Sequence, residues 1–331
     1  MAQRRRAHAT ALGRTACQRQ PMAAGHTPNV GLTAPMPAQR QALDPQRWHF
    51  QHGPIDLVIQ ADGDPACVHA AHELAWNAFQ TILPNLVHEL QQLRQAVQPA
   101  AANPLHGAVA RSMWQACAPL AHPCPTHPEG FITAMAAVAG GVAQSVLACY
   151  QGPGIERAWV NNGGDIALHL TPDTSVRIGL VSDIARAWGA SPLNDLVLDG
   201  ALHISADMPV RGVATSGWRG RSQSLGIADS VTVLAASAAQ ADAAATLIAN
   251  AVNVDDPRIV RQPANQLRDD ADLGPRLVTV DVPPLSPARI ERALARGRAY
   301  AHQLQTQGLI HAALLCCQGQ IEVAGHEACL A

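Results

Sequence analysis

Hydrophobic positions follow two patterns along this chain, helical spacing in the first half and short continuous runs in the second. From Val68 to Val97, apolar residues recur every three or four positions, which predicts a long amphipathic helix with a kink or break near Pro84. The same spacing predicts further helices over about 108–120, 132–150 and 287–305.

Short apolar runs that are bounded by Gly, Pro, Asn or Asp predict β-strands. One run precedes the long helix, IDLVI at 55–59, and the others follow Gly154: RAWV, DIALHL, VRIGLV, GALHIS, RGVATS, SVTVLAA, RLVTVDV and a closing pair around LIHAALL and QIEVAG. Asn162-Gly163 lies between the first two of these later runs and is the turn signal of a β-hairpin. Because helices dominate the first half and strands the second, we predict a single α+β domain over residues 47–331.

Residues 1–46 differ from the rest of the chain in composition. They are rich in Arg, Gln, Ala and Pro and show no apolar periodicity, so we predict a disordered N-terminal tail that ends at residue 46. The basic start at 4–6 has no apolar segment after it, which argues against a secretory signal. No apolar run is long enough to span a bilayer. We therefore expect a cytoplasmic protein that does not enter membranes.

Charge and residue usage exclude several kinds of chemistry. The 331 residues carry a formal net charge of −2, and only 15% of them are charged, so we expect no binding to nucleic acid driven by bulk electrostatics. The sequence contains no Lys, which excludes P-loop NTPases and enzymes that use a Lys Schiff base. The eight Cys residues form no CxxC pair. Two groupings of Cys and His lack the spacing typical of structural zinc sites: Cys67, His69 and His72, and His122, Cys124 and His127.

The segment from Arg211 to Val252 holds the strongest candidate chemistry. A predicted strand ends in Thr215, Ser216 and Gly217, and small residues of this kind let backbone N–H groups approach an anion closely. Arg side chains add donors that match the geometry of phosphate. The loop that follows is rich in such groups, namely Arg219, Gly220, Arg221, Ser222 and Ser224. The alternative is a polar, solvated loop that binds no ligand.

An Ala-rich helix follows the next strand and carries two oxygen-bearing side chains, Asp242 and Thr246. Residues four positions apart lie on the same face of a helix. Carboxylate and hydroxyl oxygens are hard ligands, and Mg²⁺ usually binds through one or two carboxylates together with substrate phosphates. We therefore expect this helix face to hold Mg²⁺.

Two pairs of Gly allow both a structural and a functional interpretation. Gly163 and Gly164, which precede Asp165, fit a tight hairpin, and they also allow a ligand to approach the backbone closely. Gly140 and Gly141 fit a closely packed helix, and the alternative is an exposed backbone carbonyl that reaches a metal ion or cofactor.

Three blocks, taken together, resemble the ApbE-like superfamily of FAD:protein FMN transferases. NNGGDI at 161–166 is similar to the family's Gly-Gly-Asp hairpin, and VATSG at 213–217 is similar to its TSG segment. SVTVLAASAAQADAAAT at 230–246 resembles the strand and helix that end in an Asp-xxx-Thr pair. Across most of residues 47–331 the chain resembles even more an uncharacterised, non-exported branch of that superfamily, of the UPF type. The resemblance implies an ApbE-like domain with a T-fold-like core.

The resemblance also implies roles for particular residues. In the transferases, the Asp and Thr of the last block bind Mg²⁺ together with a backbone carbonyl from an earlier Gly/Ala-rich segment, and the matching positions here are Asp242, Thr246 and Gly141. The flavin nucleotide, FAD or FMN, would lie beside the TSG block, the hairpin and the two Arg residues of the loop. Its expected contacts are Thr215, Ser216, Gly217, Gly163, Gly164, Asp165, Arg219 and Arg221.

This chain departs from the transferases in two places. After TSG the family carries His-Ile-Ile-Asp-Pro, which contributes to catalysis, whereas RSQSLGIADS at 221–230 contains neither His nor Pro. Where the transferases have Lys after the Gly/Ala-rich segment, Gln144 stands here. Asp229 is the only carboxylate in the replacement loop and is the one candidate for a catalytic base.

Three functions are consistent with these residues. The first is binding of a flavin nucleotide with Mg²⁺ in a cleft, without FMN transfer. The second is a Mg²⁺-dependent FAD:protein FMN transferase, whose partner is an acceptor protein. The third is a non-catalytic binding or assembly protein that uses the same cleft. The missing His favours the first or the third over the second.

Overall fold

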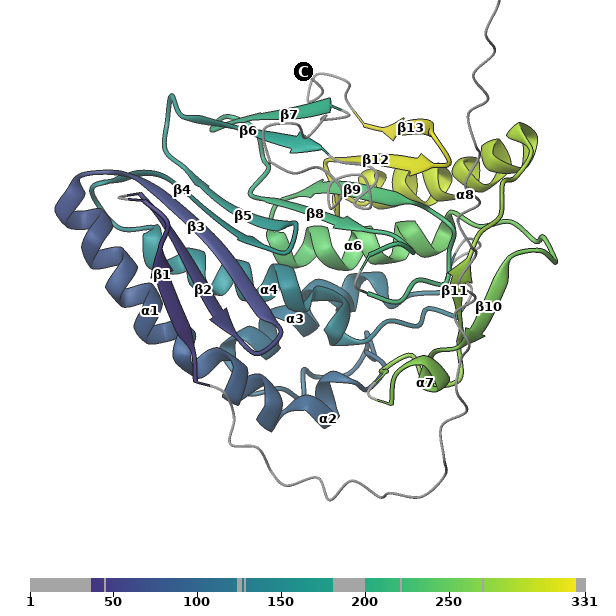
Figure 1. Ribbon diagram of the computed structural model, residues 1–331, viewed down its shortest axis with the longest axis horizontal. Coiled ribbons are helices and arrows are strands. Elements are labelled where there is room, and N and C mark those ends of the chain that lie inside the picture. Colours follow the sequence, from purple (N-terminus) through teal and green to yellow (C-terminus); the bar gives the residue numbers. More distant parts are fainter. Residues whose placement is uncertain are drawn as a thin grey trace, which may run out of the picture. The chain divides into compact units, whose positions relative to one another are not determined.

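A nine-stranded antiparallel sheet carries the fold (Figure 1). The computed structural model describes residues 37–44, 46–123, 127, 129–180, 200–220, 222–269 and 271–325, and all of them belong to one compact unit that spans Met36–Ala331. The strands in spatial order are β1 (Gln39–Ala42), β2 (Arg47–His52), β3 (Ile55–Gly63), β4 (Ile155–Asn162), β5 (Asp165–Leu170), β8 (Gly212–Ser216), β9 (Ser230–Ala235), β12 (Ala312–Cys317) and β13 (Gln320–Ala324).

Helices cover one face of this sheet, and four of them each pack against a neighbouring pair of strands (Figure 1). They are α1 (Pro65–His88) on β2 and β3, α4 (Val138–Leu147) on β4 and β5, α6 (Ala238–Ala251) on β8 and β9, and α8 (Pro287–Thr306) on β12 and β13. The other helical elements are α2 (Leu90–Leu93), α3 (Ala108–Cys117) and α7 (Ala264–Leu267), with 3₁₀ turns η1 (Ala118–Leu120), η2 (Ala134–Ala137) and η3 (Ala148–Tyr150).

A second, smaller core lies on the opposite face of the sheet. There the hairpin of β6 (Ser175–Leu180) and β7 (Gly200–Ser205) packs Leu202 and Ile204 against Leu168, Val213 and Leu234 of the sheet. A separate two-stranded ribbon is formed by β10 (Val260–Pro263) and β11 (Leu277–Asp281). The α+β prediction, with helices mainly early and strands mainly late, is confirmed by this arrangement.

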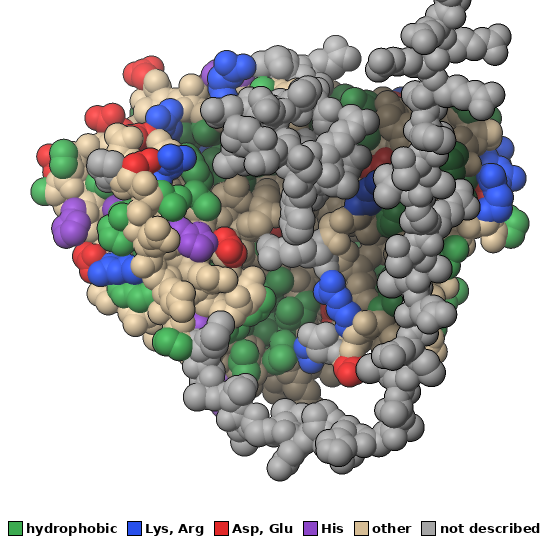
Figure 2. All heavy atoms as spheres, in the orientation of Figure 1, with side chains coloured by type: hydrophobic (Ala, Val, Ile, Leu, Met, Phe, Trp, Pro, Cys, Tyr) green, Lys and Arg blue, Asp and Glu red, His purple; other side chains and the backbone are tan. Residues whose placement is uncertain are grey.

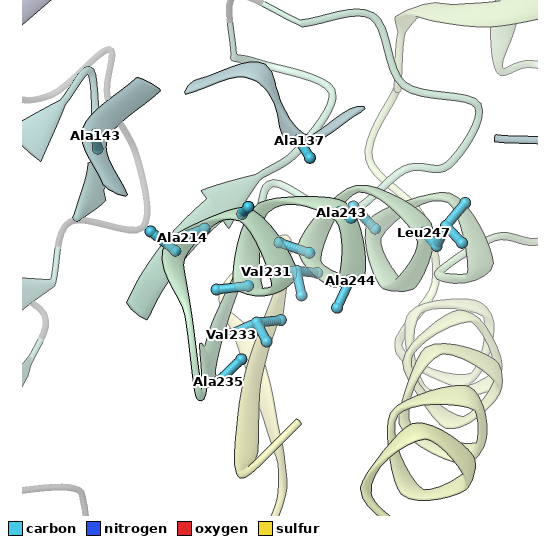
Figure 3. Packing of buried hydrophobic residues seen from close by; sticks show 14 of the residues in the cluster. Ala137, Ala143, Ala214, Val231, Val233, Ala235, Ala243, Ala244 and Leu247 are labelled. Atoms are coloured by element: carbon cyan, nitrogen blue, oxygen red, sulfur yellow. The ribbon is translucent and has the colours of Figure 1, made fainter. Parts of the chain in front are cut away.

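The helix α6 lies unusually close to its neighbours because small residues meet on both sides of it. Its Ala side chains, among them Ala243 and Ala244, belong to the same buried cluster as Val231 and Val233 of β9 (Figure 3). A Cβ on Gly212 of β8 would lie 2.2 Å from the backbone N of Ala238 at the start of α6. Because its buried side chains are mostly those of Ala, the helix α6 lies close to the sheet. At Gly212 the backbones of β8 and α6 meet without intervening side chains.

The first strand lies inside the segment that we predicted as a tail, so the boundary at residue 46 was wrong. The Arg40 guanidinium of β1 lies 5.3 Å from the ring centroid of Trp48 and 5.2 Å from that of Trp76, and it pairs with Glu73 at 2.6 Å. These contacts reach residues well beyond the strand itself, and they stabilise a strand whose four residues are all exposed. Residues 1–36 lie outside the described residues.

Two predicted helices also differ in detail. The long helix continues through Pro84 and ends at His88, and the break falls at Glu89, whose carboxylate accepts hydrogen bonds at 2.7 Å from the backbone of both His106 and Gly107. The helix therefore breaks where Glu89 contacts a segment distant in sequence, and it does not break at Pro84. The helix predicted over 132–150 consists of η2, α4 and η3 in succession.

Charges of both signs are interspersed on the face of the molecule shown in Figure 2, in keeping with the small net charge. Within the described part of the chain, no helix is both long and apolar enough to cross a membrane.

We predict that Gly140→Ala destabilises the fold. A Cβ at Gly140 would lie 2.2 Å from the carbonyl O of Ala238, so α4 and α6 must separate to make room. Overpacking of this kind costs about 1–3 kcal/mol, and the better helix propensity of Ala offsets at most about 1 kcal/mol of it. The matched control is Gly152→Ala, where a Cβ would meet nothing within 4 Å. Urea unfolding measures both variants, and equal free energies of unfolding would contradict the close contact.

Candidate functional site

One cavity of about 1470 Å³ receives side chains from most of the segments that the sequence singled out. Its described lining comes from the β4–β5 turn, the end of β8 and the loop after it, η2 and the start of α4, one face of α6, and the segments 129–133 and 268–276. Ordinary ligand pockets measure roughly 300–1,000 Å³, so this cavity is large enough for a dinucleotide-sized molecule.

The β4–β5 turn forms the hairpin that the Asn-Gly signal predicts. Gly163 has φ +66° and Gly164 has φ +113°, as a tight turn with left-handed central residues requires. Asn162 and Asp165 pair across the turn, and both side chains are buried. The Asn162 amide donates to the carbonyl of Ala139 at 3.1 Å, which fixes the turn against the start of α4.

A polar stripe runs along the helix α6. Ten of its fourteen residues are buried, whereas Asp242, Thr246 and Asn250 are partly exposed and line the cavity. Their spacing of four residues places all three on one helix face. The sequence analysis found the first two and missed Asn250, although the same four-residue spacing identifies it.

Asp242 lies where α6 meets the start of α4. Its carboxylate accepts a hydrogen bond from the backbone N–H of Gly140 at 3.0 Å, and the N–H of Ala139 contributes a second. Burial raises the pKa of Asp242 well above its ordinary value of 3.8, and the neighbouring carboxyl of Asp165 raises it further, while the two backbone donors act in the opposite direction. Among the described residues, no Arg or His forms an ion pair with Asp242.

The end of β8 contributes backbone and hydroxyl groups to the same cavity. The N–H of Thr215 donates to Asp165 at 3.1 Å, so the TSG segment and the hairpin turn are joined directly. The Thr215 hydroxyl bonds that of Thr232 at 2.9 Å on the adjacent strand. Ser216 and Gly217 follow along the cavity wall.

The loop after β8 brings Trp218 and Arg219 to the cavity, and both bind Asp229. The Arg219 Nε donates to Asp229 at 3.0 Å, the Trp218 indole N–H donates at 3.3 Å, and the backbone N–H of Gln318 donates to the second carboxylate oxygen. A carboxylate held by three donors is a structural anchor, which argues against the role of catalytic base that the sequence left to Asp229.

The rest of this loop is fixed to the end of α6. The side-chain oxygen of Asn250 accepts from the Ser224 hydroxyl at 3.1 Å and from the Leu225 N–H at 2.9 Å, and the side-chain amide of Asn253 donates to the backbone carbonyl of Leu225 at 3.0 Å. The N–H of Thr279 donates to the Ser224 carbonyl at 2.8 Å. Ser224, Leu225 and Ile227 therefore anchor the segment that replaces the family's His-containing stretch to α6, to the residues just after it and to β11.

The outer wall of the cavity combines an aromatic ring with charged groups. The Arg276 guanidinium lies 3.4 Å from the ring centroid of Phe131 and pairs with Glu129 at 3.2 Å. The Thr133 hydroxyl donates to the Asp272 carboxylate. No sequence motif pointed to these residues, because their segments meet only in the folded chain.

Several expected site residues fall elsewhere. Gly164 does not line the cavity, because it lies at the outer corner of the hairpin turn, where a Cβ would meet nothing within 4 Å. Gly141 is buried against Met113 of α3, and the cavity is lined instead by Ala139, two residues earlier. Arg221 lies outside the described residues.

Gln144, which stands where the transferases have Lys, serves the fold in this chain. Its side-chain oxygen accepts from the Ala239 N–H at 3.4 Å, near the first turn of α6. In the described part of the chain, no group of three or more His, Cys, Asp or Glu side chains is placed to hold a metal ion.

Comparison with known proteins assigns the chain to a family. The model of the family described as AbpE bacteria matches residues 39–323. A UPF0280 protein of Methanoregula boonei is 32% identical over 164 residues, which cover 48% of this chain and 65% of that protein. A UPF0280 protein of Methanosarcina acetivorans is 31% identical over 225 residues, which cover 66% of this chain and 79% of that protein.

Some of these matches are partial. A UPF0280 protein of Methanothermobacter thermautotrophicus is 41% identical over 137 residues, and this chain spans only 49% of the length of that protein. The chain likewise spans less than two thirds of the Methanoregula protein.

Solved structures of flavin transferases are among the structures that this chain resembles, at low similarity. A mutant of the flavin transferase ApbE from Vibrio cholerae is 15% identical with a TM-score of 0.41, over 83% of this chain and 94% of that one. The flavinyl transferase ApbE from Pseudomonas stutzeri is 13% identical with a TM-score of 0.44, over 88% and 94%. Likenesses this remote do not say which residues correspond.

The family match covers nearly the whole described chain, and the UPF0280 relatives confirm the expected branch. The chain therefore belongs to the family described as AbpE bacteria.

Proposed function

We propose that the cavity binds a flavin nucleotide, FAD or FMN, together with Mg²⁺, and that the protein does not transfer FMN to an acceptor protein. The observation that supports this most strongly is the polar stripe of α6, whose Asp242 and Thr246 share one cavity with Asp165 and the TSG segment. The flavin itself is inferred from the resemblance of these blocks to the FMN transferases.

The surroundings of Asp242 suit a divalent cation. The carboxyl of Asp165 lies close enough to raise the pKa of Asp242, and Asp242 itself forms no ion pair with an Arg or His among the described residues. Mg²⁺ prefers carboxylate and other hard oxygen ligands, which Asp242 and the Thr246 hydroxyl provide. Ala139, which lines the cavity, is a better source of a backbone carbonyl than Gly141.

The TSG segment and Arg219 suit the phosphates of the nucleotide. Ser216 and Gly217 bring small residues and backbone to the cavity wall, and Arg219 keeps its terminal NH₂ groups for an anion while its Nε binds Asp229. When bound, Mg²⁺ would neutralise phosphate charge at this end of the cavity.

Transfer of FMN requires a group that accepts the proton of the attacking hydroxyl. The loop 221–230 contains no His, the whole chain contains no Lys, and Asp229 is occupied by three donors. We therefore propose binding of the flavin nucleotide and not transfer of FMN.

The first prediction concerns the pH dependence of stability without metal. The folded-state pKa of Asp242 is raised, so the folded protein loses stability relative to the unfolded chain as Asp242 ionises at rising pH. Asp242→Asn should become progressively more stable than the unmodified protein between about pH 4 and pH 8. Near pH 8, saturating Mg²⁺ should reduce the difference in free energy of unfolding between the two proteins, because it stabilises only the unmodified protein. Urea unfolding across this range is the measurement, and a difference independent of pH would contradict the raised pKa.

The second prediction concerns the metal dependence of flavin binding. Thr246→Val removes the hydroxyl at nearly constant shape, whereas Thr246→Ser keeps it and is the matched control. Equilibrium dialysis with FAD should show that the Val variant needs at least about tenfold more Mg²⁺ for half-maximal binding, because a metal ligand is lost. Asp242→Asn should remove the Mg²⁺ dependence. An equal Mg²⁺ requirement of the Val and Ser variants would exclude Thr246 as a ligand.

The third prediction is that no FMN becomes covalently attached to an acceptor peptide. The protein is incubated with FAD, Mg²⁺ and a peptide accepted by a FMN transferase, which serves as the positive control, and the peptide is analysed by mass spectrometry. An added FMN on the peptide would establish the transferase alternative and show that another group serves as the base.

A further inference from the structure

Trp218 is one of two Phe, Tyr or Trp side chains that line the cavity in the described part of the chain, and Phe131 is the other. The two rings are covered to different extents. The Arg276 guanidinium lies 3.4 Å from the centroid of Phe131, in direct stacking contact, whereas the Arg219 guanidinium lies 5.0 Å from the centroid of Trp218. Both side chains are partly buried, and the guanidinium contact is the looser one at Trp218, which makes Trp218 the better candidate for contact with a ligand.

The position of Trp218 is fixed at both its backbone and its ring. Its N–H donates to the carbonyl of Ala228 at 3.0 Å, and its indole N–H donates to Asp229 at 3.3 Å. The preceding residue, Gly217, lies so close to this segment that a Cβ there would be 2.3 Å from the Asp229 carbonyl O. The ring thus has little freedom to lose when a ligand binds, which favours affinity.

Asp229 is held in turn by the β12–β13 turn. Its backbone N–H donates to the carbonyl of Cys316 at 2.9 Å, and its carboxylate accepts from the N–H of Gln318, which adopts a left-handed φ of +45°. The Gln318 side chain accepts from the Leu285 N–H at 2.9 Å. The Asp229 side chain is only 11% exposed. Through these hydrogen bonds it connects the cavity wall to the β12–β13 turn.

We propose that Trp218 selects ligands that carry a planar ring system, by stacking, and that Asp229 is the positioning residue that holds Trp218 and Arg219 in place. The proposal rests on the proposed function, since the ring in question is the tricyclic flavin. Stacking of a flat aromatic ring on an indole needs no hydrogen bond to the ring, so FAD and FMN should both use this surface.

The test measures FAD binding by equilibrium dialysis with saturating Mg²⁺ for Trp218→Leu, Trp218→Phe and Trp159→Leu. Trp159 packs on the second core and does not line the cavity, so it controls for general loss of an indole. We expect Trp218→Leu to weaken FAD binding about tenfold, Trp218→Phe to retain most of the affinity, and Trp159→Leu to change it little. The fluorescence of bound flavin should be quenched in the unmodified protein and recover in Trp218→Leu.

Asp229→Ala tests the positioning role. It should weaken FAD binding less than Trp218→Leu does and should partly restore the fluorescence of the bound flavin, while the Mg²⁺ dependence through Asp242 and Thr246 persists. Asp229→Asn keeps an acceptor for the indole and should retain more of the quenching than Asp229→Ala does.

Several outcomes would overturn the proposal. They are unchanged FAD affinity in Trp218→Leu, equal losses in the Leu and Phe variants, a comparable loss in Trp159→Leu, and flavin that stays quenched in Trp218→Leu. Loss of the Mg²⁺ dependence in Asp229→Ala would overturn the positioning role. If the unmodified protein binds neither FAD nor FMN, the proposed function fails, and this result is distinct from all the others.

Discussion

The close approach of α6 to α4 and β8 is the contact on which the site depends. A Cβ on Gly140 or on Gly212 would each lie 2.2 Å from the backbone of Ala238, so only glycine allows these segments to meet. Because the backbones touch, Asp242, one turn further along α6, reaches the N–H of Gly140 at 3.0 Å. Gly140 therefore allows the close packing of α4 and α6, and this packing positions the Asp242 carboxylate.

The cavity combines opposing electrostatic effects around that carboxylate. Backbone N–H groups and the dipole at the start of α4 favour the ionised form of Asp242, whereas burial and Asp165 disfavour it. A protein that only needed stability at this position would gain from an apolar residue of similar size. A carboxyl that lies beside a second carboxyl, faces a large cavity and has a strongly raised pKa is typical of a functional site, and this supports the proposed role of Asp242.

Periodicity and spacing were sufficient to predict the α+β order, the Asn-Gly hairpin and the α6 face that carries Asp242 and Thr246, because these depend on neighbours within a few residues. What the sequence did not show depends on long-range contacts. The Gly140–Asp242 bond joins residues 102 positions apart, and the Gln318–Asp229 bond spans 89. Gly141 was expected to face the cavity, whereas Ala139 lines it, because a resemblance marks a segment but does not determine which of its residues faces the cavity.

The loop after the TSG segment determines what kind of site this is. Gly226 fits only without a side chain, since a Cβ there would lie 1.9 Å from the Ala249 carbonyl, and the flanking residues bind Asn250 and Asn253 at the end of α6. A segment held this firmly cannot swing a base toward a substrate, and it contains no His to swing. The same hydrogen bonds hold the loop that carries Trp218 in a fixed position relative to the face of α6 that carries Asp242. Such rigidity supports the proposed function of nucleotide binding without transfer, because a preorganised wall lowers the entropy lost on binding and adds nothing to proton transfer.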